Sequence, residues 1–120
     1  MKALLAILAI IPVSASADTP HAPTRLSKVA VFDFCALHIH AAGREKLSAF
    51  AKEWKHNRSR VTVEGNALAV DEESSIALGQ HRADRVRDYL IHEGVDAAYI
   101  TAIGNSRGEP GRYVDLVVAP

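Results

Sequence analysis

The feature that most constrains the fold of this chain is an alternation of short β-type segments with two longer helical ones. Apolar side chains recur every three or four residues over 41–57, and again between the polar loop at Asp71 and Glu93, which is typical of amphipathic helices. Segments rich in β-branched and aromatic residues predict four strands, at 28–34, 60–64, 99–103 and 113–118. Because strand–helix–strand steps are right-handed, the order predicts an α+β domain of β-α-β-α-β-β type, with both helices on one face of a mixed sheet.

The apolar positions of the two helices indicate which faces should be buried. The stripe of the first helix is Leu47, Phe50, Ala51 and Trp54. The stripe of the second helix is Ile76, Ala83, Val86 and Leu90. Acidic residues at the start of the second helix and Gly94 just after it are typical of helix ends.

The N-terminus has the layout of a secretory signal peptide. A basic residue at Lys2 is followed by eleven apolar residues at 3–13, and then by an A-x-A arrangement that ends at Ala17. Eleven apolar residues are too few for a membrane-spanning helix, which needs roughly 20. We therefore predict a signal peptide at 1–17, cleaved after Ala17.

The rest of the chain divides into a leader and one domain. Residues 18–27 contain two prolines and few apolar side chains, so we predict a short flexible leader. Residues 28–120 form the predicted domain, which has no second apolar run long enough for a membrane anchor. Cys35 is the only cysteine, so no intramolecular disulfide is possible. A buried thiol is the expected role of Cys35, and a reactive or intermolecular thiol is the alternative.

The charge of the predicted mature chain gives no reason to expect a polyanionic partner. Removing Lys2 from 14 basic residues leaves 13 against 14 acidic ones, a formal charge of −1. Such a chain has no general attraction to nucleic acid or to anionic lipid. We expect neither nucleic acid binding nor a membrane span.

Four segments carry a resemblance to a known family. They are 32–34 (FDF), 61–65 (VTVEG), 78–95 (LGQHRADRVRDYLIHEGV) and 104–114 (GNSRGEPGRYV). In that order they resemble the first strand, the second strand before the ligand loop, the arginine-containing helix and the closing segment of the OmpA-like, peptidoglycan-associating family. The resemblance covers most of the predicted domain. It implies the fold predicted above and non-covalent binding of the diaminopimelate peptide of peptidoglycan, in the periplasm and associated with the cell wall or outer membrane.

The family's ligand explains why the site uses an arginine and a carboxylate. The free end of diaminopimelate is a zwitterion, and an arginine engages its carboxylate with two parallel hydrogen bonds, which a lysine does not. Arg82 stands where the family's ligand arginine stands, directly before a helix alanine. The alternative for Arg82 is an ordinary exposed helix arginine, and from sequence we expect its position to be exposed.

The other positions of the site depart from the family pattern. Leu68 occupies the place of the family's aspartate and cannot hold an ammonium group. Asp71 is the available substitute, and it is equally suited to capping the following helix. Ser75 corresponds to a family asparagine, and Arg112 retains one arginine of the closing N-R-R motif. The resemblance thus implies a degenerate peptidoglycan site of Arg82, Asp71, Ser75 and Arg112.

Other kinds of site find less support. His38 and His40 are two residues apart on an extended segment, so their side chains point the same way and could bind a zinc ion together with a third ligand. The sequence has no third ligand at a characteristic spacing from them. We therefore predict no metal and no cofactor. No nucleophile motif or phosphate-binding loop is present, and we predict no enzyme.

Two functions remain open. The first is weak peptidoglycan binding, which Arg82 favours. The alternative is an OmpA-like fold that has lost its ligand and acts as a protein-interaction or structural component of an envelope complex, which the loop after Gly65 favours. We rank wall binding first.

Overall fold

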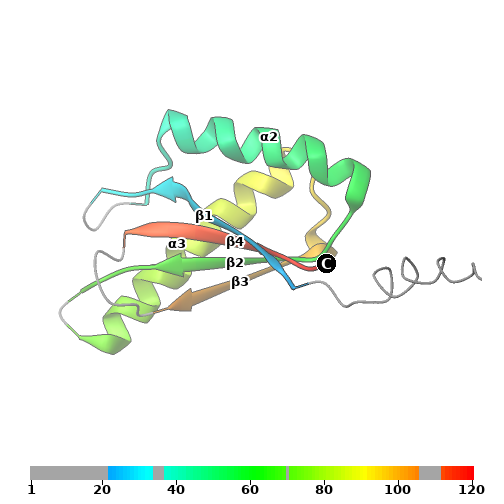
Figure 1. The fold of residues 1–120 in the computed structure, drawn as a ribbon. Coiled ribbons are helices and arrows are strands. Elements are labelled where there is room, and N and C mark those ends of the chain that lie inside the picture. Colours follow the sequence, from blue (N-terminus) through cyan, green and yellow to red (C-terminus); the bar gives the residue numbers. More distant parts are fainter. Residues whose placement is uncertain (1–21, 34–36, 70, 106–111) are drawn as a thin grey trace, which may run out of the picture.

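A computed structural model describes residues 22–33, 37–69, 71–105 and 112–120, which form a sheet covered by helices (Figure 1). In chain order the elements are β1 (Thr24–Val31), α2 (Ala41–Asn57), β2 (Val61–Asn66), α3 (Glu72–His92), the 3-10 helix η2 (Ala97–Tyr99), β3 (Ile100–Asn105) and β4 (Tyr113–Val118). The predicted signal peptide at 1–17 lies outside the described residues, as does Cys35. No helix in the described ranges is both long and apolar enough to span a membrane.

The sheet has the strand order β1-β4-β2-β3. β2 and β3 are parallel, whereas β4 pairs antiparallel with both β1 and β2. Parallel neighbours need a crossover connection, which α3 supplies. The α+β fold and the mixed sheet predicted from sequence are therefore confirmed.

Both helices share one core with the sheet. α3 packs on β2 and β3, while α2 packs on β1 and on α3. Val61 and Val63 point to the same face of β2 because side chains alternate along a strand, and both belong to the core. The helix residues of this core are Leu47, Ala51, Trp54, Ala83, Val86 and Leu90. Trp54 is buried as predicted, and its Nε1 donates to the carbonyl of Ser59 at 2.7 Å.

Two predicted core positions differ in the structure. Phe50 is only partly buried at the edge of the core. Ile76 is 41% exposed, and Ser75 is buried in its place. The Ser75 hydroxyl hydrogen-bonds to the preceding loop, at the Asp71 carbonyl and the Ala69 amide, which turns Ser75 inward. The buried stripe of α3 therefore begins one residue earlier than the apolar pattern predicts.

β1 begins at Thr24, within the predicted flexible leader, and ends at Val31, before the predicted end at 34. The early start has a tertiary cause, because Thr24 pairs with Val118 and Leu26 with Leu116 on β4. A β-bulge between Leu26 and Ala30 shifts the register, and within it Lys28 has a φ of 54°. A bulge interrupts the in–out alternation of a strand, so the first residues of β1 carry no regular strand pattern and the predicted strand began only at Lys28.

α3 approaches the sheet closely enough for backbone to meet backbone. A Cβ built on Gly65 of β2 would lie 1.9 Å from the carbonyl oxygen of Gly79 on α3. A Cβ on Gly104 of β3 would lie 2.3 Å from the carbonyl oxygen of Ile76. These glycines are thus required by the helix–sheet distance, and they bring α3 directly over the ends of β2 and β3.

Candidate functional site

Arg82 is the central residue of the candidate site, and the structure buries it. Its side chain is 1% exposed. Nη2 donates to the carbonyl of Asp33 at 2.9 Å, and Nη1 donates to the carbonyl of Asn66 at 3.4 Å. The guanidinium carbon lies 5.2 Å from the centre of the Phe32 ring, in a cation–π arrangement. The sequence-based expectation of an exposed Arg82 was therefore wrong.

These contacts give Arg82 a position where three segments meet. Asp33 follows β1, Asn66 ends β2, and Arg82 itself lies on α3. The side chain of Asn66 is fully buried, and its Nδ2 donates to the carbonyl of Tyr113 at 3.3 Å. Its Oδ1 has no hydrogen-bond partner within the described ranges, and leaving a buried acceptor unpaired is costly. Sequence reasoning did not single out Phe32 or Asn66 as part of this site, and only their contacts identify them.

Asp71 and Ser75 lie at the start of α3 and hold the loop that precedes it. The Asp71 carboxylate accepts a hydrogen bond from the Ser74 amide at 2.7 Å, which makes Asp71 the N-cap of α3. The Ser75 hydroxyl donates to the Asp71 carbonyl and accepts from the Ala69 amide, each at 2.8 Å. Asp71 and Arg82 are eleven positions apart on one helix, a rise of about 16 Å. The structure does not bring Asp71 next to the guanidinium.

Leu68 lies in the loop between β2 and α3, and its side chain is 48% exposed. It is two residues beyond Asn66, whose carbonyl contacts Arg82. An exposed apolar side chain therefore stands on the loop that follows the contact between Asn66 and Arg82.

Arg112 lies apart from Arg82, just before β4. Its side chain is exposed, and with Lys28, Val31 and Tyr113 it lines a small cavity of about 120 Å³. Its carbonyl accepts a hydrogen bond from the Phe32 amide at 2.8 Å. Arg112 thus contributes to the site through its backbone, because it holds Phe32, the residue after β1, whose ring lies against Arg82.

The cap at Asp71 makes the stability of α3 depend on pH. The hydrogen bonds from the Ser74 amide and the Ser74 side chain hold the pKa of Asp71 below its ordinary value. A lowered carboxylate pKa stabilises the fold above the ordinary pKa, and this stabilisation is lost as the pH falls through the lowered pKa. We expect Asp71→Ala to lower the melting temperature most at neutral pH, and the difference from the parent to shrink below about pH 4.

Melting curves by circular dichroism between pH 2.5 and 7 would measure this effect. Glu53→Ala is the control, because it removes an exposed carboxylate from α2 without removing a cap. A melting difference for Asp71→Ala that stays constant over this pH range would contradict the role of the carboxylate as a cap.

His38 and His40 are close together, with ring centres 5.8 Å apart. His40 Nε2 also lies 3.3 Å from a carboxylate oxygen of Asp33. Over the described ranges, no cluster of three or more histidine, cysteine or acidic side chains is placed to hold a metal ion.

Comparison with known proteins agrees with the fold and with the arrangement of these segments. The model of the OmpA family matches residues 31–115. The peptidoglycan-associated lipoprotein of Pseudomonas putida is 31% identical over 83 residues, which are 66% of this chain and 48% of that protein. The match therefore spans about half the length of that relative.

Two solved structures share the fold. The OmpA-like domain of FopA1 from Francisella tularensis superposes with a TM-score of 0.69 at 24% identity, over 82% of this chain and 73% of that one. The periplasmic domain of MotB from Helicobacter pylori gives a TM-score of 0.66 at 14% identity, over 84% of this chain and 78% of that one. These identities are evidence of a common fold only. The family model, however, covers more than half of the sequence, and this chain belongs to the OmpA family.

Proposed function

We propose that this protein binds peptidoglycan non-covalently and weakly, through the diaminopimelate peptide, in the periplasm at the cell wall. Membership of the OmpA family supports the proposal, as does the similarity to a peptidoglycan-associated lipoprotein. The protein then acts as a binding module rather than as an enzyme.

The observation that carries the proposal is the position of the Arg82 guanidinium. It lies where the loop after β2 and the segment after β1 meet on α3, and it is bound there by two backbone carbonyls. The bond to Asn66 is 3.4 Å long, beyond the usual range for an N–H···O hydrogen bond. A peptide carboxylate is a stronger acceptor than a carbonyl, so it is able to replace Asn66 at Nη1.

The weakness of binding follows from position 68. The ammonium group of diaminopimelate needs an acidic partner, and Leu68 offers an alkyl side chain instead. Losing one partner of a desolvated charge pair typically costs about 2–5 kcal/mol of binding free energy. Asp71 does not compensate readily, because its carboxylate already caps α3 about 16 Å away along the helix.

We expect Leu68→Asp to strengthen binding to diaminopimelate-type sacculi by at least about tenfold, which corresponds to ~1.4 kcal/mol. The substitution restores an ammonium partner at an exposed position two residues after Asn66, whose carbonyl contacts Arg82. Co-sedimentation with purified sacculi, over a range of protein concentrations, measures the bound fraction of each variant. Leu68→Asn is the matched control, because it has nearly the same size as aspartate and no charge.

If the parent and Leu68→Asp both stay in the supernatant at every concentration, wall binding fails. The alternative is then the ligand-free fold that serves as an interaction or structural component of an envelope complex. An exposed Leu68 favours this alternative, since an exposed apolar side chain on the loop after β2 suits a protein partner better than a zwitterion.

A further inference from the structure

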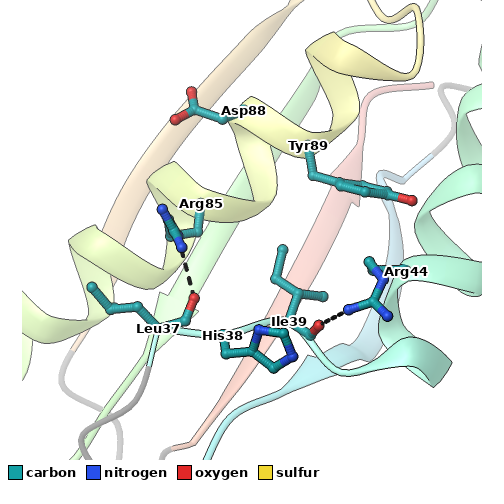
Figure 2. A pocket seen from close by; sticks show the side chains of 7 residues that line it. All are labelled: Leu37, His38, Ile39, Arg44, Arg85, Asp88 and Tyr89. Atoms are coloured by element: carbon teal, nitrogen blue, oxygen red, sulfur yellow. Dashed lines mark hydrogen bonds between the residues drawn. The ribbon is translucent and has the colours of Figure 1, made fainter.

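A pocket of about 370 Å³ lies between the segment after β1 and the two helices, one turn of α3 beyond Arg82 (Figure 2). Its lining residues are Leu37, His38, Ile39, Arg44, Arg85, Asp88 and Tyr89. Ile39 is buried and forms an apolar floor, and the Tyr89 ring extends from α3 toward Arg44. The Tyr89 hydroxyl is 3.0 Å from the hydroxyl of Ser48 on α2, a contact that holds the ring in place.

Two guanidinium groups line this pocket, and the backbone holds each of them. Arg85 Nε donates to the carbonyl of Leu37 at 3.3 Å, and Arg44 Nη1 donates to the carbonyl of Ile39. Figure 2 shows the two arginines at opposite ends of the short segment 37–39. A guanidinium has five N–H donors, so each arginine keeps several for a ligand.

Neither arginine is neutralised by an acid of the described ranges, in contrast to three other arginines of the chain. Arg25 lies 2.7 Å from Glu64, Arg58 lies 3.8 Å from Asp96, and Arg87 lies 3.8 Å from Asp88. Arg44 and Arg85 have no carboxylate oxygen within 4 Å in the part of the chain that the structure describes.

Asp88 is the acidic residue of the lining, and it does not cancel the two positive charges. Its side chain is 70% exposed, and its carboxylate lies beside Arg87. Figure 2 shows this carboxylate directed away from Leu37 and His38. The pocket is therefore apolar at its floor and cationic at its rim, which suits a carboxylate on a short organic chain.

We infer that this pocket binds a carboxylate group, and that its source is the diaminopimelate peptide of the cell wall. The identity of the ligand rests on the proposed function. Arg82 and Arg85 are neighbours on α3, because residues three apart lie on the same face of a helix. Arg82 donates to Asp33 and Arg85 donates to Leu37, so both contact the segment that leads from β1 to α2. A wall peptide carries more than one carboxylate. Arg82 and Arg85 would each bind a different carboxylate of the same peptide.

The probe for this pocket is meso-diaminopimelate, titrated into the purified protein and followed by amide resonances in NMR spectra. Cadaverine is the matched ligand control, because it has the same carbon chain and both amino groups but no carboxylates. We expect diaminopimelate, and not cadaverine, to shift the resonances of residues 37–39 and of Arg44 and Arg85. We expect Arg85→Gln to weaken this binding at least tenfold.

Arg87→Gln is the matched protein control, since Arg87 lies on the same helix and does not line the pocket. Arg85→Gln removes an exposed side chain, so a change in melting temperature of more than a few degrees is not expected. The inference is overturned if diaminopimelate shifts no resonance of the pocket residues. It is also overturned if diaminopimelate binds Arg85→Gln and Arg87→Gln equally well.

Sacculi separate this inference from the proposed function. If the parent sediments with sacculi and Arg85→Gln sediments equally well, the pocket inference fails and wall binding stands. If the parent does not sediment but binds diaminopimelate through Arg85, wall binding fails and the carboxylate pocket stands. Reduced sedimentation of Arg85→Gln, with Arg87→Gln unchanged, supports both.

Discussion

Gly65→Ala is expected to leave the protein without a stable native fold. The new Cβ would lie 1.9 Å from the carbonyl oxygen of Gly79 and 2.8 Å from the amide nitrogen of Ala83. Both contacts are backbone atoms of α3, so no side-chain rotation relieves them, and the helix has to move off the sheet. Overpacking of side chains typically costs about 1–3 kcal/mol of stability. We expect a larger loss here, because the new Cβ collides with backbone atoms. A single domain of this size has only about 5–15 kcal/mol of stability to lose.

Chemical denaturation followed by circular dichroism and tryptophan fluorescence measures this loss. Gly43→Ala is the matched control on α2. The Cβ added there would lie 3.2 Å from Cγ2 of Ile39 and 3.4 Å from Cα and Cβ of Ala30, far looser contacts than at Gly65. The change also improves helix propensity by about 1 kcal/mol. We expect Gly43→Ala to stay close to the parent. A Gly65→Ala protein that unfolds cooperatively within a few degrees of the parent would mean that α3 does not lie on β2 as described.

Arg82→Ala is expected to lower the free energy of unfolding by about 3–5 kcal/mol, the range for removing a large buried side chain. The arginine is 1% exposed, so its removal opens a cavity against the Phe32 ring. It also removes the donors that satisfy the carbonyls of Asp33 and Asn66, and an unsatisfied buried acceptor costs about 1–3 kcal/mol.

Urea denaturation of Arg82→Ala beside Arg87→Ala separates this role from that of an ordinary helix arginine. Arg87 is partly exposed and its Nη1 lies 3.8 Å from the Asp88 carboxylate, so its removal is expected to change stability by no more than about 0.5 kcal/mol. Equal stability of the two variants would contradict the burial of Arg82. A large loss in Arg82→Ala also means that lost sacculus binding would not by itself identify Arg82 as a ligand residue. The gain expected for Leu68→Asp is the sharper functional test.

The sequence by itself determined the order of the elements, the α+β class and the family. These depend on local patterns, because a helix stripe at three- and four-residue spacing or a β-branched run is visible within one short segment. The buried Trp54 and the closing strand at Tyr113–Val118 were predicted in this way and are confirmed. The glycines at 65 and 104 were visible as parts of family motifs, but the close approach of α3 that requires them was not.

The tertiary structure alone decided which polar residues are buried and what they contact. Arg82 reads as a surface residue in a run of charged side chains, yet Asp33, 49 positions earlier, and Asn66, 16 positions earlier, supply the carbonyls that allow its burial. The same holds for the start of β1, where pairing with β4 extends the strand through Thr24. Arg44 of α2 and Arg85 of α3 line one pocket because both donate hydrogen bonds to the segment after β1. Burial and pairing are properties of partners distant in the chain, and a local pattern does not contain them.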